Sequence, residues 1–322
     1  MAATATHYDL GIARVGVPSR DLPWCMRKDA NIPWPARRLL EKYSHIPSED
    51  VEKTVFGPGA SQRGRAWEVY PYPCIGHWDF LDFQLAARND LYHNLLSRIK
   101  GGAKHLDIGC CLGHDIRKLI FDGAPSENLV GVEISQGYTD LGFDLFRDKE
   151  TTKTRFFQGD VLESAGLWPQ LEGKFDVVNI GMFLHLFTWE ENIKVFERAL
   201  KSLKTGELGT TIIGNAVGNI NDGVMVHYNN EAIPTHNVES FQRLISQFEE
   251  RTGTKWEVSA ELDTGLGIYD GKRPYVDPKI RRLIFQITWI AQGILPIVGE
   301  DKAGGSNMVL KRSRVSILFA YI

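Results

Sequence analysis

A turn of small residues follows an acidic residue in the segment Asp107-Ile108-Gly109-Cys110-Cys111-Leu112-Gly113. An apolar run, residues 103–109, enters the turn, and a helical pattern over residues 115–123 follows it. Small residues let the backbone approach a ligand, and the first N–H groups of a helix are free to donate hydrogen bonds. The segment therefore predicts either a backbone ligand site or a tight strand-to-helix turn without a ligand.

Glu133 ends the second predicted strand, residues 128–134. A carboxylate at that position can accept hydrogen bonds from two ribose hydroxyls. Proteins that bind nicotinamide dinucleotides and proteins that bind S-adenosyl-L-methionine (SAM) share this feature, so Glu133 alone does not separate them. The alternative is a solvent-exposed strand end.

Two further strand ends carry groups that suit a nucleoside. Asp160 follows the third predicted strand, where its carboxylate can accept from an adenine amino group while the Val161 N–H donates to the ring. The fourth predicted strand, residues 174–181, ends at Gly181 and leads into the loop 182–187, beside the reacting end of a bound cofactor. The glycine spacing departs from the G-x-G-x-x-G expected of a nicotinamide site.

Composition limits the class of protein. The chain has 322 residues, 43% hydrophobic and 24% charged, which is ordinary for a globular protein and excludes disorder or a coiled coil as the main architecture. A net charge of −3 argues against a nucleic-acid partner. The four cysteines include no C-x-x-C pair, which predicts neither a disulfide framework nor a metal site and favours the cytoplasm. We see no secretory signal and no membrane span.

The pattern predicts an α/β fold, a doubly wound, Rossmann-like and mostly parallel seven-stranded sheet whose last strand is antiparallel. The predicted strands are residues 103–109, 128–134, 154–161, 174–181, 207–218, 256–262 and 314–322. Helical patterns lie between them, and right-handed crossovers would place the loops that follow the parallel strands at one edge. The very apolar segment 283–298 is interpreted as a buried or interface helix, which could also join two copies in a homodimer.

The chain divides near residue 101. Residues 1–101 are predicted to be a helical, aromatic-rich extension with helices near 35–43 and 80–99, and residues 102–322 the catalytic domain with a helical insertion at 263–313. The aromatic residues of the extension predict either a lid over the site or a small core that packs the extension onto the domain: Trp67, Tyr70, Tyr72, Trp78 and Phe80.

The ordered set of Asp107 with its turn, Glu133, Asp160 and the fourth strand resembles class I SAM-dependent methyltransferases over residues 102–322. Several segments give a closer resemblance, to fungal secondary-metabolite methyltransferases that methylate polyketide–terpenoid hybrids, typically at a carboxylate oxygen: residues 67–76, 106–134, 141–148, 183–187 and 235–241. Cys111 stands where class I enzymes usually have glycine. Similar proteins carry polar or cationic residues before the Val-Gly-Asn, whereas the stretch 214–219 contains no cation, which leaves hydroxyl, amine and carbon acceptors open.

The resemblance implies a role for each cofactor residue. Around the methionine moiety it places Asp107, Gly109, Cys110 and Gly113. It places Glu133 at the ribose and Asp160 with Val161 at the adenine, and it gives the Gly181 carbonyl to the cofactor's amino group. The implied activity is O-methylation, to a methyl ester or at a hydroxyl, of a small lipophilic secondary metabolite in a polyketide or terpenoid pathway. N- or C-methylation, a NAD-dependent oxidoreductase, and a non-methylating cyclisation or binding protein are the alternatives.

His185 is the candidate general base, because imidazole titrates near neutral pH and its loop faces the site, although it could instead fix the loop. His227 and His236 fit loop or helix-capping positions better than a ligand role, with Thr235 and Asn237 available to cap the helix 237–253. The candidate substrate-binding residues are Tyr72, Trp78, Phe183, Asn215, His236 and Trp289.

Overall fold

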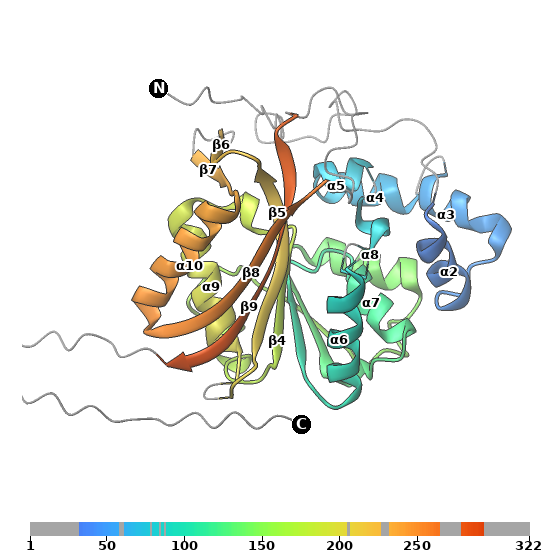
Figure 1. Cartoon of the computed structure of the whole chain (residues 1–322). Helices are drawn as coiled ribbons and strands as arrows, with labels where there is room; N and C mark the ends of the chain where they lie inside the picture. The colour runs from blue at the N-terminus through green and yellow to red at the C-terminus, as the bar shows by residue number, and fades with distance from the viewer. Residues whose placement is uncertain are drawn as a thin grey trace, which may run out of the picture.

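The structure, a computed structural model, describes residues 32–57, 61–77, 79–83, 85–86, 88–204, 207–226, 232–264 and 278–292. In it, seven strands form one sheet in the order β3-β2-β1-β4-β5-β9-β8 (Figure 1). The strands are β1 (His105–Ile108), β2 (Leu129–Glu133), β3 (Arg155–Gln158), β4 (Val177–Gly181), β5 (Thr211–Asn219), β8 (Thr254–Asp263) and β9 (Ile280–Gln292). This architecture confirms the predicted fold class.

The directions of the strands decide where a ligand can bind. Strands β1 to β5 pair in parallel, and β9 runs antiparallel to both of its neighbours, β5 and β8. The order reverses at β1, from which the chain proceeds first to β2 and later to β4 on the other side. In open α/β sheets ligands bind at such a switch point, outside the carboxyl ends of the strands.

The prediction of a helix in the segment 283–298 is wrong for residues 283–292, the part that the structure describes. Residues up to Gln292 belong to β9, and Leu283, Phe285 and Ile287 of this strand enter the main core. An apolar run with β-branched and aromatic residues can form either a buried helix or a buried strand. Here the segment forms a strand, because it pairs with β5 and β8. The strand expected at 314–322 lies outside the described residues, and β9 holds the antiparallel position instead.

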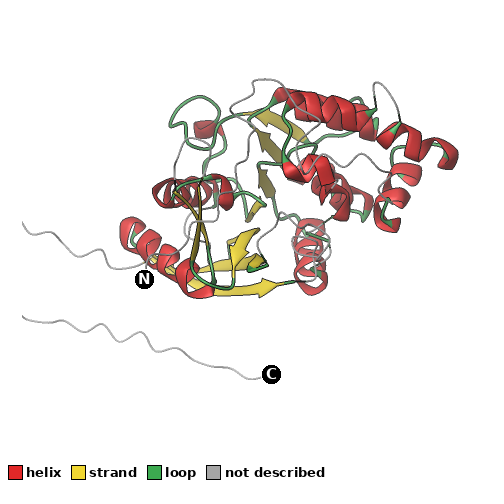
Figure 2. Cartoon of the chain, turned by 90° about the horizontal axis from the view of Figure 1, so that it is seen from above, coloured by secondary structure: helices red, strands yellow, loops and turns green. Residues whose placement is uncertain are grey.

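Helices cover both faces of the sheet (Figure 2). Helices α6 (Asn89–Lys100), α7 (His114–Phe121) and α8 (Gln136–Phe146) lie on one face, and α9 (Trp189–Ser202) and α10 (Val238–Thr252) lie on the other. Both α9 and α10 begin with a capping box, in which the N-cap side chain and the third helical residue exchange hydrogen bonds. The N-cap of α10 is Asn237, one of the residues that the sequence offered for this role.

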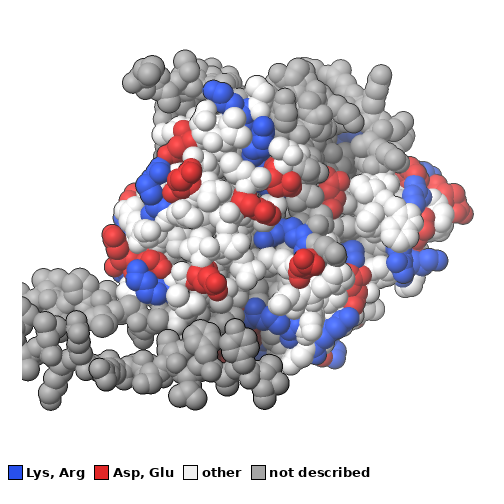
Figure 3. All heavy atoms as spheres, viewed as in Figure 1, with Lys and Arg blue, Asp and Glu red and all other residues white. Residues whose placement is uncertain are grey.

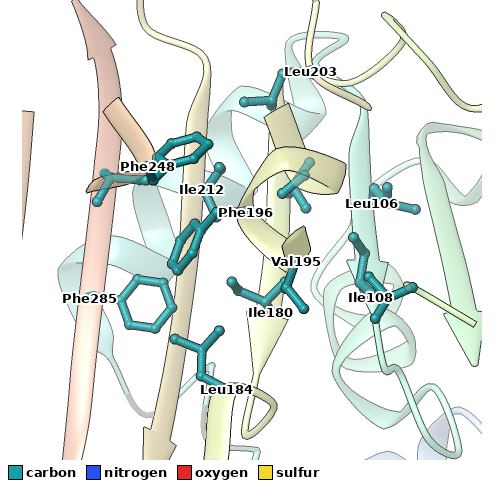
Figure 4. Packing of buried hydrophobic residues seen from close by; sticks show 14 of the residues in the cluster. Leu106, Ile108, Ile180, Leu184, Val195, Phe196, Leu203, Ile212, Phe248 and Phe285 are labelled. Carbon is teal, nitrogen blue, oxygen red and sulfur yellow. The ribbon is translucent and has the colours of Figure 1, made fainter. Parts of the chain in front are cut away.

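The largest hydrophobic core lies between the sheet and the α9–α10 layer (Figure 4). Phe196 of α9 packs against Phe248 of α10 and Phe285 of β9, with ring centroids 5.6 and 6.0 Å apart. These fully buried rings pack one face of the sheet tightly against α9 and α10. Close packing of this kind makes the sheet a rigid scaffold for the carboxyl ends of β4 and β5.

A second core joins the N-terminal helices to the domain. Helices α2 (Trp34–Lys42), α3 (Val51–Phe56), α4 (Gln62–Val69) and α5 (Pro73–His77) lie beside α8 (Figure 1). Trp67 and Phe80 are buried there together with Leu112 of the turn after β1 and Tyr138 of α8. For Trp67 and Phe80 the packing interpretation therefore holds. The predicted helix 80–99 is shorter in the structure, because α6 begins only at Asn89.

A hairpin that the sequence did not predict lies after β5. Strands β6 (Gly223–Val226) and β7 (Ala232–Thr235) pair antiparallel with each other, and β7 packs against β5 and the 3-10 helix η5 (Leu184–Leu186). The hairpin thus stands beside the carboxyl ends of β4 and β5.

Lys and Arg alternate with Asp and Glu on the face shown in Figure 3, and no large surface of one sign gathers there. Among the described residues no helix is both long and apolar enough to cross a membrane. Nor do the described ranges contain a cluster of three His, Cys, Asp or Glu side chains that could hold a metal ion.

Candidate active site

The turn after β1 has the backbone that a close ligand approach requires. Gly109 and Gly113 have φ of 75° and 65°, a region that side chains rarely adopt. A Cβ on Gly109 would lie 2.6 Å from the Phe183 ring, and a Cβ on Gly113 equally near Arg117 and Phe156. Cys111 has φ of 51°, so a non-glycine residue here adopts the left-handed backbone.

Glu133 binds this turn directly. Its Oε2 accepts from the Cys111 N–H at 2.9 Å, and its Oε1 accepts from the Ser135 N–H at 3.1 Å. Burial raises the pKa of the carboxyl, and these backbone donors partly oppose that effect. Each oxygen has a second lone pair, so the carboxylate can still accept from two ribose hydroxyls.

Asp107 lies beneath the turn and is almost fully buried. Asn179 of β4 donates to its Oδ1 at 2.8 Å. Burial, with contributions from the nearby Asp115 and Glu133, raises the pKa of Asp107 to about 8. Three acidic side chains, Asp107, Asp115 and Glu133, thus lie near one turn. Such a cluster favours a cationic ligand, and SAM carries an ammonium and a sulfonium group.

The end of β3 supplies the next expected position. Leu162 donates to the Asp160 Oδ1 at 2.9 Å, and Trp168 Nε1 donates to the Asp160 carbonyl. The Asp160 side chain is half-buried, whereas Val161 is buried. The sequence reasoning missed Ile134, which follows Glu133 and is 56% exposed, unusual for isoleucine next to a buried strand. An apolar residue directly after the strand-end acid was the signal available.

Cys110 and Tyr72 both lie close to the turn and Glu133. The Cys110 side chain is buried under the turn, so only its backbone reaches the site; its carbonyl accepts from Gly113 at 2.7 Å. Tyr72, expected at the substrate, packs on Tyr70 and Tyr138 and interacts electrostatically with Glu133, which with burial raises its pKa. The structure therefore places Tyr72 on the Glu133 side of the site.

The loop after β4 is held by Asn215 of β5. Met182 has φ of 49°, and its N–H donates to the Asn215 Oδ1 at 2.9 Å. Asn215 is buried opposite Gly181 in the strand register. The expected substrate residue Asn215 therefore positions the loop, while Phe183 of the same loop covers Gly109 and packs edge-on against Phe187 at 4.8 Å.

His185 lies in the 3-10 helix η5 and is half-buried. The Val217 N–H of β5 donates to its Nδ1 at 3.4 Å. Burial lowers the pKa of His185 to about 4, so the ring is neutral at pH 7. With Nδ1 accepting, the proton of the neutral ring resides on Nε2.

His236 is enclosed rather than presented to a substrate. It is 1% exposed, packs against Trp189 and Phe241, and its Nδ1 lies 3.2 Å from the Ser240 Oγ. Burial lowers its pKa to about 4. The structure therefore encloses His236 beside the N-terminus of α10, and its contact with a substrate stays a prediction.

Trp289 corrects another expectation. It stacks on Trp256, and its N–H donates to the Thr210 carbonyl, which precedes β5. That is the edge opposite the carboxyl ends of the parallel strands, so Trp289 is excluded from the site. Trp78 and His227 lie outside the described residues.

Arg88 is a residue that the sequence analysis missed. Its guanidinium donates to the carbonyl of Gly214 at 3.2 Å and to that of Phe285 at 3.4 Å. Burial lowers its pKa to about 10, which still leaves it charged at neutral pH. The extension thus brings a cation beside β5, where the stretch 214–219 has none.

Two family models match the chain. The model described as the meroterpenoid methyltransferase N-terminal domain matches residues 24–81, and the model described as a methyltransferase domain matches residues 106–206. The first covers helices α2 to α5, and the second covers the strands that carry the turn and Glu133.

Curated relatives span most of the chain. The O-methyltransferase phiE of Fungal sp. (strain ATCC 74256) is 37% identical over 76% of this chain and 84% of its own length. The O-methyltransferase atr3 of Stereocaulon alpinum is 38% identical over 77% and 71%. The Asnovolin E/Chermesin D methyltransferase nvfJ of Aspergillus novofumigatus is 35% identical over 73% and 86%.

Proposed function

Because the chain belongs to the SAM-dependent methyltransferases of fungal secondary metabolism, we propose that it methylates a carboxylate oxygen of a small apolar metabolite, giving a methyl ester. The names of phiE and atr3 as O-methyltransferases support an oxygen acceptor. Membership in this family removes the nicotinamide oxidoreductase as an alternative.

The hydrogen bond from Val217 to the Nδ1 of His185 carries the proposal. A histidine that acts as a general base must have an unprotonated ring nitrogen free to accept the substrate's proton. In His185 the unprotonated nitrogen is Nδ1, and it already accepts the Val217 N–H. Nε2 can only donate, which suits a carboxylate or carbonyl oxygen. A carboxylate is ionised at neutral pH and needs no base, whereas a hydroxyl acceptor would need one.

The cofactor residues fit SAM. When bound, SAM supplies an electrophilic methyl group on a sulfonium. We propose that Glu133 holds the ribose, that Ile134, Asp160 and Val161 border the adenine, and that the Gly109 turn and the Gly181 carbonyl receive the methionine moiety. The protein then contributes alignment and exclusion of water, which are the main demands of an in-line methyl transfer.

Apolar side chains near the carboxyl end of β5 support a lipophilic acceptor. Ile220 and Val224 are 46% and 45% exposed, and Phe183 and Phe187 on the loop after β4 are partly exposed. Exposed apolar groups beside polar ones are typical of small-molecule sites. We propose that Arg88, which the extension brings beside Gly214, lines this side of the site together with the β6–β7 hairpin.

Product chemistry tests the proposal. Extracts of a host with and without the gene are compared by mass spectrometry. A metabolite that appears only with the gene, and that carries one methyl group more than its precursor, is then treated with mild alkali. We expect methanol release and return of the acid, because esters saponify and methyl ethers, amines and C-methyl groups do not. An alkali-stable product would contradict carboxylate methylation.

A matched pair of variants tests His185. His185→Gln keeps an N–H donor at the position of Nε2, and His185→Phe removes it. We expect the Gln variant to retain roughly tenfold more kcat than the Phe variant. We also expect the wild-type kcat to be flat between pH 6 and pH 8, because the pKa of His185 lies near 4. A fall in kcat below pH 7 that both variants abolish would indicate a base instead.

A further inference from the structure

A buried arginine lies directly behind the cofactor turn. Arg117 of α7 is 1% exposed, and its Nη1 donates to the Leu112 carbonyl at 2.7 Å and to the Gly113 carbonyl at 3.4 Å. These carbonyls belong to the last two residues of the turn. The guanidinium therefore fixes the turn from the side opposite the ligand face.

The surroundings of Arg117 are built to hold a planar cation. Three phenyl rings lie 4.7 to 5.3 Å from its guanidinium carbon: Phe143, Phe146 and Phe156. A Cβ on Gly113 or Gly142 would lie 2.6 and 3.1 Å from Nη1, so two glycines leave the necessary space. Removing such a group from water is costly unless it is paired.

The partner of Arg117 is Asp148, which follows α8. The pair is bidentate, with Nε to Oδ2 and Nη2 to Oδ1 both at 2.8 Å. The Tyr43 hydroxyl donates to the same Oδ2 at 2.8 Å. Burial and the neighbouring carboxylate raise the pKa of Tyr43, so its hydroxyl stays protonated and remains a donor.

Tyr43 is the C-cap residue that follows α2 in the N-terminal extension. A continuous chain of hydrogen bonds therefore runs from the extension through Asp148 and Arg117 to the turn at Leu112 and Gly113. A charge-assisted pair in a dry environment transmits displacement because neither partner can move without losing two bonds.

We propose that Tyr43, Asp148 and Arg117 are positioning residues through which the N-terminal extension sets the affinity of the turn for the cofactor. This inference rests on the proposed role of the turn in binding SAM. None of the three side chains touches the ligand face, so the effect falls on cofactor affinity and not on the transfer step.

The test compares two single substitutions at the same interface in the full chain. Tyr43→Phe removes only the hydroxyl and keeps the ring. Arg65→Gln breaks the exposed pair between α4 and Asp144 of α8, whose Nη2–Oδ2 distance is 2.6 Å, and serves as the control. Affinity for S-adenosylhomocysteine, kcat and KM at varied SAM, melting temperature, and hydrogen exchange of residues 109–113 are measured.

We expect Tyr43→Phe to raise the Kd and the KM for the cofactor about tenfold, to leave kcat at saturating SAM unchanged, and to speed exchange in the turn. Arg65→Gln should change none of these values more than twofold. Unchanged affinity in Tyr43→Phe, or an equal loss in Arg65→Gln, would overturn the inference. If the wild type bound no cofactor, the proposed function would fail, whereas unaltered exchange in Tyr43→Phe would refute the link itself.

Discussion

The candidate site has two sides, a cofactor side at the ends of β1 and β2 and an acceptor side at the ends of β4 and β5. Burial shifts the pKa values of their titratable groups in opposite directions. At the carboxyl ends of β1 and β2, burial raises the pKa of Asp107 and Glu133. In the loop after β4, burial lowers the pKa of His185. Burial disfavours the charged form in each case, so the first side gains from a cation and the second stays neutral.

The two sides also differ in how the chain builds them. The proposed cofactor side comes from strand ends in chain order, because the ends of β1 to β4 supply Asp107 to Gly113, then Glu133, Asp160 and Gly181. The acceptor side combines a loop after β4, an asparagine in β5, an unpredicted hairpin and an arginine from the extension. We therefore expect substitutions on the cofactor side to weaken cofactor binding and substitutions on the acceptor side to lower kcat.

The largest effect is expected on the cofactor side. Glu133→Ala removes the acceptor of the Cys111 and Ser135 N–H groups and the expected ribose partner. We expect the Kd for S-adenosylhomocysteine to rise about 100-fold, or about 2.7 kcal/mol, by calorimetry. Glu150→Ala, an exposed acid beyond α8, is the control and should bind as the wild type does. A Glu133 variant with wild-type affinity would remove the ribose role.

A smaller effect is expected on the acceptor side. Asn215→Ala leaves the Met182 N–H without its acceptor and frees a loop held at a positive φ. We expect kcat to fall roughly tenfold while cofactor Kd changes less than threefold, since the loop places the acceptor. Equal losses in kcat and cofactor affinity would show that the two sides are not separable.

The smallest expected effect is a pH dependence of cofactor binding. The unliganded Asp107 has a pKa of about 8 and is protonated below that pH, whereas a cationic cofactor favours its ionised form. Affinity for SAM should therefore rise a few-fold from pH 6 to pH 8 and then level off. Calorimetry at pH 7 in buffers of different ionisation heat should show proton release, and Asp107→Asn should abolish it. Affinity that is independent of pH would separate Asp107 from the cofactor charge.

Prediction from the sequence succeeded where the signal is local. The strands β1 to β5, the helices between them and the Asn237 cap follow from periodicity and from residue types at element ends. It failed for β9, whose continuous apolar run suits a helix or a buried strand equally. It also misplaced Trp289, because the edge of the sheet that a side chain occupies depends on strand pairing and not on its own neighbours in the chain.

The sequence by itself determined the fold class and the turn after β1, because periodicity identifies the alternating strands and helices and because consecutive small residues of one strand–turn–helix unit form the turn. Only the tertiary structure decided the acceptor side and its link to the extension. Arg88, Asn215 and Tyr43 act on partners more than 30 residues away, and such contacts arise from packing, where burial sets both the protonation state and the direction of each hydrogen bond.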